Sequence, residues 1–364
     1  MDTLTHALSG ALLARATEPA SYDKDRHADQ LPRRLRMWVG AWSAAFPDSD
    51  FVVSFVNSYS YLTVHRGVTH SILMLPLWAM GLAFLFRLIT RQRYAWRAFV
   101  GTCALGIAAH IAGDIITSFG TMVLAPLSHW RAELSTTFII DLYFSGIIVA
   151  GLIASWYWSK TRVPALAALA LLAGYVGFQA LQHHRAVEIG NAYIATRHLE
   201  SAEAEAMPQP FSPFNWLVIV QQPNAYHLSY ISLWRQEAPP PPPDDAHWLS
   251  RANASYRPAN QALWESVPRY GRDPSDAALA ETVWRADTLA RYRDFALFPA
   301  LYRVDREPQH TCVWFSDLRF AMKGRTMPFR YGACRDQGAH DNAWKIYRLQ
   351  NDDTGRDLLD AIPD

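Results

Sequence analysis

Apolar segments of membrane-span length occupy much of the first half of this chain and constrain its fold more than any other sequence feature. Four of them carry almost no charge, and they cover residues 71–89, 98–119, 142–159 and 163–182. A helix needs about 20 mainly apolar residues to cross the hydrocarbon core of a bilayer. Because only helices and closed barrels satisfy every backbone polar group in lipid, these segments predict four membrane-spanning helices.

Two further apolar stretches are weaker span candidates. Residues 37–56 carry Asp48 and Asp50 in their second half, and residues 3–14 are short for a span. The alternative is that all these segments are buried helices of a large soluble core. We favour membrane spans because the four stronger segments follow one another within about 110 residues.

The positions of the arginines predict how these helices are oriented. Cytoplasmic loops are rich in Lys and Arg. The connection between the first two strong segments holds four arginines, namely Arg87, Arg91, Arg93 and Arg97. With this connection inside, alternation places residues 120–137 outside, Lys160 inside, and the chain beyond about residue 182 outside.

The second half of the chain has a different composition. Residues 205–364 hold most of the 22 prolines and no apolar run of span length. Residues 215–234 have the pattern of two strands around a turn, and residues 275–297 that of an amphipathic helix. Further strand-like runs cover residues 310–320 and 327–334. This half is expected to be a soluble α+β domain.

The predicted fold class is therefore mainly α, with a multi-pass transmembrane helical bundle followed by a C-terminal α+β soluble domain. We expect residues 1–200 to form the transmembrane domain in the cell's inner membrane, and residues 205–364 to lie outside the cytoplasm. The lipid bilayer is the expected partner. Lys and Arg number 34 against 33 Asp and Glu, which leaves no excess charge for nucleic-acid binding. The sequence does not indicate an oligomeric state.

Two of the three cysteines are placed to form a disulfide. Cys312 and Cys334 lie symmetrically about Lys323, where Lys-Gly-Arg is expected at the tip of a hairpin. Cross-strand positions would bring the two thiols together, and an oxidising compartment outside the cytoplasm would permit the bond.

A histidine and an aspartate within one apolar segment indicate a metal site. His110 and Asp114 are four residues apart, so a helix places them on one face, one turn apart. Ionisable groups in a span are unfavourable toward lipid and face a protein interior or a water-filled cleft. Imidazole and carboxylate are typical ligands of a divalent ion such as zinc. The alternative is a buried His–Asp hydrogen bond between helices.

Other His and Asp residues are expected at the same membrane level in the orientation that the arginines predict. Arginines before residue 37 place the end of the 37–56 segment outside, and His6 joins this level if the N-terminal helix begins outside. The residues of this kind are His6, Asp48, Asp50, His65, His70, His110, Asp114 and Asp141, with His129 and Glu133 in the adjoining outer loop. They exceed what one ion needs, so one or two divalent ions are predicted.

Four motifs that contain these residues resemble the YdjM-type family of membrane-bound, metal-dependent hydrolases. They are DTLTHALSG at 2–10, AAFPDSD at 44–50, HRGVTHS at 65–71 and HIAGDIITSFGT at 110–121. Their order is more distantly similar to that of zinc-dependent phospholipase C enzymes. That likeness implies five metal ligands, namely His6, Asp48, His70, His110 and Asp114. The phospholipase pattern continues with further ligands, for which this chain offers only His129, Glu133 and Asp141.

The resemblance implies hydrolysis by a metal-activated water of a phosphoester, or another ester, in an amphiphilic or lipid-linked substrate at the outer membrane face. Asp50, or whichever of Asp48 and Asp50 does not bind metal, is expected to act as a base or to support a ligand histidine, as is His65. Arg66 is expected to hold a phosphate group, or alternatively to anchor the chain at the membrane interface.

Two other function classes remain open. The acidic and histidine residues would line an ion or proton path if the protein were an ion- or proton-coupled transporter, and they would then lie near the middle of the membrane. In a structural membrane module, the metal would only tie helices together. The orientation predicted from the arginines places these residues toward one face, which favours the hydrolase.

Overall fold

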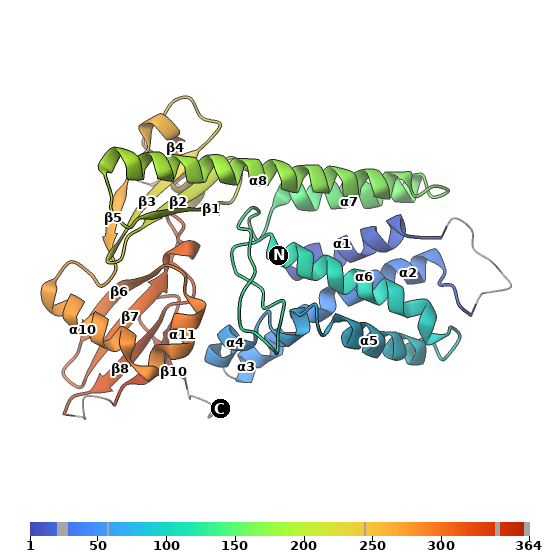
Figure 1. Ribbon diagram of the computed structural model, residues 1–364, viewed down its shortest axis with the longest axis horizontal. Coiled ribbons are helices and arrows are strands. Elements are labelled where there is room, and N and C mark those ends of the chain that lie inside the picture. Colours follow the sequence, from blue (N-terminus) through green and yellow to red (C-terminus); the bar gives the residue numbers. More distant parts are fainter. Residues whose placement is uncertain (20–27, 57, 244, 339–342, 360–364) are drawn as a thin grey trace. The chain divides into compact units, whose positions relative to one another are not determined.

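The computed structural model describes residues 1–19, 28–56, 58–243, 245–338 and 343–359 (Figure 1). The chain forms two compact units. The first contains Met1–Val52 and Val64–Leu181, and the second contains Val53–Thr63 and Gln182–Asp364. A short segment from the N-terminal half is therefore part of the C-terminal unit.

The first unit is built from helices around two apolar cores. Its elements are α1 (Thr3–Ala16), α2 (Arg33–Ala45), η2 (Phe46–Val52), η3 (Val68–His70), α5 (Leu75–Ile89), α6 (Trp96–Ile115), α7 (Leu142–Tyr157) and the first part of α8 (Val163–Arg197). Phe99 and Ile107 lie in the core shared by α2, α5 and α6. Leu12 and Ile148 lie in the core shared by α1, α7 and α8.

The number of membrane spans is lower than the sequence predicts. Among the described helices, α6 and α8 are long and apolar enough to cross a membrane. The paired helices Tyr59–His70 and Leu75–Ile89 give a third span if they are counted together, although they are bent by 78°. Helix α7 has only 16 residues. The prediction of four spans is thus corrected to two or three.

Prolines explain where two apolar segments are interrupted. Pro76 lies in the first turn of α5, so this helix begins only at Leu75, within the predicted 71–89 segment. Pro47 has no backbone N–H to continue the α-helical hydrogen bonds, and α2 ends at Ala45. The predicted 37–56 segment is therefore divided among α2, the 3₁₀ helix η2 and the short helix α3 (Val53–Val56).

Glycines allow α1, α2 and α6 to pack with their backbones in contact. A methyl group on Gly40 of α2 would lie 2.5 Å from the Gly10 carbonyl oxygen of α1, and one on Gly106 of α6 would lie 2.8 Å from the Gly40 carbonyl oxygen. Such close crossings through small residues are typical of helices in membranes. They place the end of α2 beside the middle of α6.

The second unit contains two five-stranded sheets. Its elements are α3, α4 (Ser58–Val64), β1 (Glu203–Pro208), β2 (Asn215–Gln221), β3 (Ala225–Ser232), α9 (Trp248–Ser255), β4 (Arg257–Pro258), η4 (Ala259–Gln261), β5 (Glu265–Pro268), α10 (Pro274–Arg285), η5 (Asp287–Leu289), α11 (Ala290–Phe295), β6 (Pro299–Arg306), β7 (His310–Asp317), η6 (Leu318–Phe320), β8 (Tyr331–Asp336), β9 (Lys345–Leu349) and β10 (Arg356–Leu358). The strand orders are β1-β2-β3-β4, with β5 also paired to β3, and β10-β9-β8-β7-β6.

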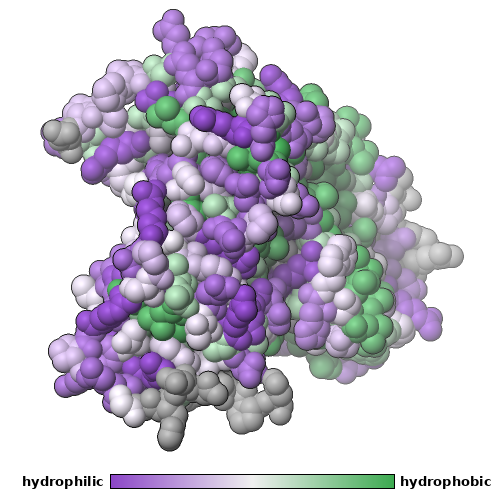
Figure 2. Space-filling view, turned by 60° about the vertical axis from the view of Figure 1, so that its left-hand side comes forward, coloured by the Kyte–Doolittle hydropathy of each residue, from purple (hydrophilic) through white to green (hydrophobic). Residues whose placement is uncertain are grey.

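The two sheets of the second unit share an apolar core. Leu217 and Tyr226 of the first sheet and Ala300 of the second are buried in it. On the other face of the first sheet, Trp216 packs in a cluster with Ala186 of α8. Hydrophilic side chains predominate on the visible surface of these sheets, whereas hydrophobic side chains gather over the apolar helices (Figure 2).

The sequence predicted several elements of this unit correctly. The two strands expected in residues 215–234 are β2 and β3, which pair antiparallel. The helix expected over 275–297 is instead divided into α10, η5 and α11, because the backbone leaves the helical conformation at Ala286. The C-terminal unit is an α+β structure, as predicted.

The cysteines of β7 and β8 are bonded to each other. Cys312 and Cys334 face each other in the antiparallel register and form a disulfide, as the sequence predicted.

Reducing this disulfide is expected to lower the free energy of unfolding of the second unit by about 3 kcal/mol, because the bond closes a chain loop with a sequence separation of 22. Mass spectrometry after alkylation checks the bond. The denatured protein should take up one alkyl group before reduction, at Cys103, and three after it. Three alkyl groups before reduction would contradict the bond.

Candidate metal centre

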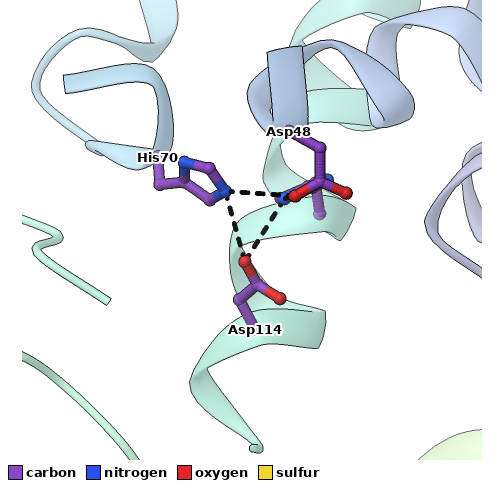
Figure 3. A group of neighbouring side chains, drawn as sticks. Asp48, His70 and Asp114 are labelled. Carbon is purple, nitrogen blue, oxygen red and sulfur yellow. Dashed lines mark ion pairs between the residues drawn. The ribbon is translucent and has the colours of Figure 1, made fainter. Parts of the chain in front are cut away.

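Four side chains from three elements of the first unit converge on one point. Asp48 lies on η2, His70 on η3, and His110 and Asp114 on α6. Each offers one ligand atom, and these atoms all lie within 4.8 Å of one another. Figure 3 shows the side chains of Asp48, His70 and Asp114 pointing toward one another.

The four His–Asp distances among these atoms are near those around a tetrahedral ion. His70 Nε2 lies 3.7 Å from Asp48 Oδ1 and 3.3 Å from Asp114 Oδ2. His110 Nε2 lies 3.6 Å and 3.3 Å from the same two oxygens. Donor atoms about 2.0–2.1 Å from a tetrahedral zinc ion lie about 3.3–3.4 Å apart. The four His–Asp distances equal these values or exceed them by up to 0.4 Å, so a zinc ion would need only a small inward shift of Asp48 along these pairs.

Three of these atoms are buried polar atoms without a hydrogen bond. Across the described part of the chain, His70 Nε2, His110 Nε2 and Asp114 Oδ2 find no hydrogen-bond partner. The three side chains are 0% exposed, whereas that of Asp48 is 15% exposed. A buried polar atom without a partner is unfavourable by about 1–3 kcal/mol. A cation bound among these atoms would satisfy all three at once.

Contacts on the opposite side of each imidazole orient the two histidines. His110 Nδ1 lies 2.6 Å from the Ala44 carbonyl oxygen at the end of α2, so this nitrogen carries the proton. His70 Nδ1 lies 2.9 Å from Thr69 Oγ1 and 3.4 Å from Asp50 Oδ2. Holding Nδ1 in this way leaves Nε2 to face the centre, which is the usual arrangement of histidine ligands.

The second oxygen of Asp114 is held by positively polarised groups. Asp114 Oδ1 lies 2.9 Å from Arg66 Nη2 and 3.0 Å from His6 Nε2, and it also contacts the amino group of Met1. These contacts fix the carboxylate with Oδ2 toward the centre. His6 thus reaches the site through Asp114, and its ring stacks on that of His110 at 3.7 Å between centroids.

Asp50, His65 and Arg66 form a layer beside the four converging residues. Asp50 Oδ1 lies 2.8 Å from His65 Nδ1, and Asp50 Oδ2 accepts a hydrogen bond from the Arg66 backbone N–H at 3.1 Å. The Arg66 guanidinium also donates to Thr117 Oγ1 at 2.9 Å and lies over the Phe119 ring. Arg66 has a positive φ of 58°, a conformation that the surrounding contacts stabilise.

Three residues that the sequence placed at or beside this level, His129, Glu133 and Asp141, lie outside the group of four. His129 is exposed and Glu133 is half-buried, both in the segment between α6 and α7. Asp141 caps the start of α7, where Oδ1 accepts hydrogen bonds from the backbone N–H groups of Tyr143 and Phe144. Its other oxygen accepts a hydrogen bond from Tyr175 at 2.8 Å. These contacts give Asp141 a structural role.

Some supporting residues were not identified from the sequence. Thr69 contacts both His70 and Asp50, the Ala44 carbonyl contacts His110, and the Thr3 hydroxyl donates to Asp48 Oδ2 at 2.5 Å. Thr69 adjoins a candidate ligand in HRGVTHS, which is the signal that could have identified it. The sequence gives no comparable indication for the Ala44 carbonyl, because every residue has a backbone carbonyl.

Comparisons with known proteins agree on the N-terminal part of the chain. The model of the YdjM inner membrane protein family matches residues 1–186. The uncharacterized protein YfhP of Bacillus subtilis (strain 168) is 26% identical over 178 residues, a match that covers 49% of this chain and 52% of the relative. The match thus spans about half the length of that curated relative. No solved structure matches the chain with significance.

Proposed function

Because this chain belongs to the YdjM inner membrane protein family, we propose that it is a membrane-bound hydrolase with one zinc-like ion held by Asp48, His70, His110 and Asp114. The convergence of four donor atoms within 4.8 Å of one another carries this proposal. Two imidazoles and two carboxylates are a donor set that suits zinc. The described residues contain one such group, which supports one ion rather than two.

An ion bound here would supply an acidified water and a positive charge for hydrolysis of an ester. The protein's own residues orient the groups that would take part in this reaction. Asp50 orients His70 and His65 through their Nδ1 atoms, and His65, with an 11% exposed side chain, is the proposed base. Arg66 is engaged with Asp114 and Thr117, so we assign it to holding Asp114 rather than to binding phosphate.

The proposed substrate is an amphiphilic or lipid-linked phosphoester at the outer membrane face. Asp48 is the partly exposed member of the group, so substrate would approach from its side. The unit that holds the site contains helices that are long and apolar enough to cross a membrane. The Cys312–Cys334 disulfide supports a C-terminal unit outside the cytoplasm, in agreement with the distribution of arginines in the loops.

Removing the metal is expected to abolish ester hydrolysis by the purified protein in detergent. The test compares metal-loaded, chelator-treated and zinc-restored protein on phospholipids and on small phosphodiesters. We expect activity to fall to background after chelation and to return with zinc, because the water loses the ion that acidifies it. Activity that survives complete metal removal would exclude this mechanism.

A structural metal site is the second candidate. Structural zinc sites are usually closed by four protein ligands, whereas catalytic sites keep a position for water, and four protein donors converge here. This candidate predicts stoichiometric zinc, thermal stabilisation by zinc, and no metal-dependent hydrolysis of any ester tested. The hydrolase predicts the same binding together with hydrolysis.

A further inference from the structure

The segment between Asp48 and His70 in the sequence includes residues 53–63, which belong to the second unit. Asp48 and Asp50 precede residues 53–63, and His65 and His70 follow them. Residues 53–63 form α3 and most of α4, and they are part of the second unit. The chain therefore leaves the first unit after the aspartates and returns to it just before His65.

Tyr59 of α4 is the anchor of this segment in the second unit. Its side chain is buried, and its hydroxyl donates to the Thr288 carbonyl oxygen at 2.9 Å. The same hydroxyl accepts a hydrogen bond from the Tyr292 backbone N–H at 3.2 Å. Its ring lies 5.8 Å from that of Tyr331. Leu62, one turn further along α4, is fully buried.

The residues that receive Tyr59 are themselves fixed in the second unit. Tyr292 is fully buried, and its hydroxyl donates to the Phe329 carbonyl oxygen at 2.9 Å. The Thr288 hydroxyl donates to the Trp344 carbonyl oxygen at 3.0 Å. The η5–α11 segment that binds Tyr59 is thus hydrogen-bonded to the residues that precede β8 and β9.

We propose that metal binding by Asp48 and His70 is thermodynamically coupled, along the chain, to the anchoring of residues 53–63 through Tyr59. This inference rests on the proposed metal site. Only a few residues separate Tyr59 from Asp50 on one side and from His65 on the other. Anchoring Tyr59 reduces the conformational freedom of the chain on both sides of it. The chain therefore loses less conformational entropy when an ion orders Asp48 and His70.

The test is Tyr59→Phe in the full-length protein, with zinc affinity measured by competition against a chromophoric chelator. The substitution keeps the buried ring and leaves the Thr288 carbonyl and the Tyr292 N–H without their partner. We expect zinc affinity to fall about 5-fold or more, the lower end of usual coupling between sites.

Tyr226→Phe is the matched control. Tyr226 is also fully buried in the second unit, and its hydroxyl also donates to a backbone carbonyl oxygen, that of Pro299, at 3.0 Å. This variant loses a similar hydrogen bond far along the chain from residues 53–63. We expect it to lower the thermal stability of the second unit to a similar extent and to leave zinc affinity unchanged.

Hydrogen exchange gives an independent measurement. Coupling is reciprocal, so zinc should slow amide exchange in residues 58–63 and 287–295 of the wild-type protein, and less so in Tyr59→Phe. Equal zinc affinity in Tyr59→Phe and Tyr226→Phe overturns this inference and leaves the metal site intact. A wild-type protein that binds no zinc overturns the metal site itself, and this inference with it.

Discussion

Replacing His110 by alanine is expected to abolish stoichiometric zinc binding. His110 Nε2 is one of the four converging donor atoms, and its side chain is fully buried. Loss of a residue that only supports a ligand weakens metal affinity about 10–100-fold, so loss of a ligand is expected to exceed 100-fold. Zinc content after gel filtration, measured by atomic emission, checks the result.

His129→Ala provides the matched control for this experiment. His129 is exposed and lies outside the group of four, so this variant should keep the zinc content of the wild-type protein. If both variants retain one zinc per chain, the site assignment is wrong. If His129→Ala also loses zinc, residues of the outer segment join the site, as the sequence first predicted.

Replacing Gly40 by alanine is expected to destabilise the first unit by about 1–3 kcal/mol, the usual effect of overpacking. The new methyl group would lie 2.5 Å from the Gly10 carbonyl oxygen and 2.7 Å from Ala14 Cβ, so α1 and α2 must move apart. Gly40 is one turn before Ala44, whose carbonyl orients His110. Displacing α2 therefore also moves this carbonyl and Asp48, and zinc affinity should fall.

Gly101→Ala is the control, because it makes the same glycine-to-alanine change within a helix but away from any close helix crossing. Gly101 is exposed on α6, and a methyl group there meets no described atom within 4 Å. In a helix this change is neutral or stabilising by up to about 1 kcal/mol. Thermal unfolding in detergent, with and without zinc, compares the two variants. Equal midpoints would show that the α1–α2 crossing tolerates a larger residue.

The sequence correctly predicted the structural features that depend only on residues close together in the chain. Helical spacing placed His110 and Asp114 on one face, and the structure has them side by side on α6. Alternation of apolar residues and turn residues identified β2 and β3, and the symmetry of two cysteines about a turn identified their disulfide. Each of these features needs only neighbouring residues or one hairpin.

The number of spans was overestimated because composition does not report helix breaks. Pro76 shortens the first strong segment, and the helix pair there is bent by 78°. Likewise, nothing in the local pattern distinguishes Asp141 as a helix cap from Asp141 as a ligand. That distinction depends on Tyr175, which lies 34 residues away in sequence.

By itself, the sequence determined that the chain has an apolar helical part and a C-terminal α+β part, and that His and Asp motifs in the first part have the chemistry of a metal site. Only the tertiary structure decided which of these residues converge, since Asp48, His70 and Asp114 come from three different elements. The glycine-mediated packing of α2 on α6 places the end of α2, which leads into Asp48, beside the helix that carries Asp114. The tertiary structure also decided that residues 53–63 belong to the second unit. The physical reason is that convergence and docking depend on side chains far apart in sequence, which periodicity and composition do not encode.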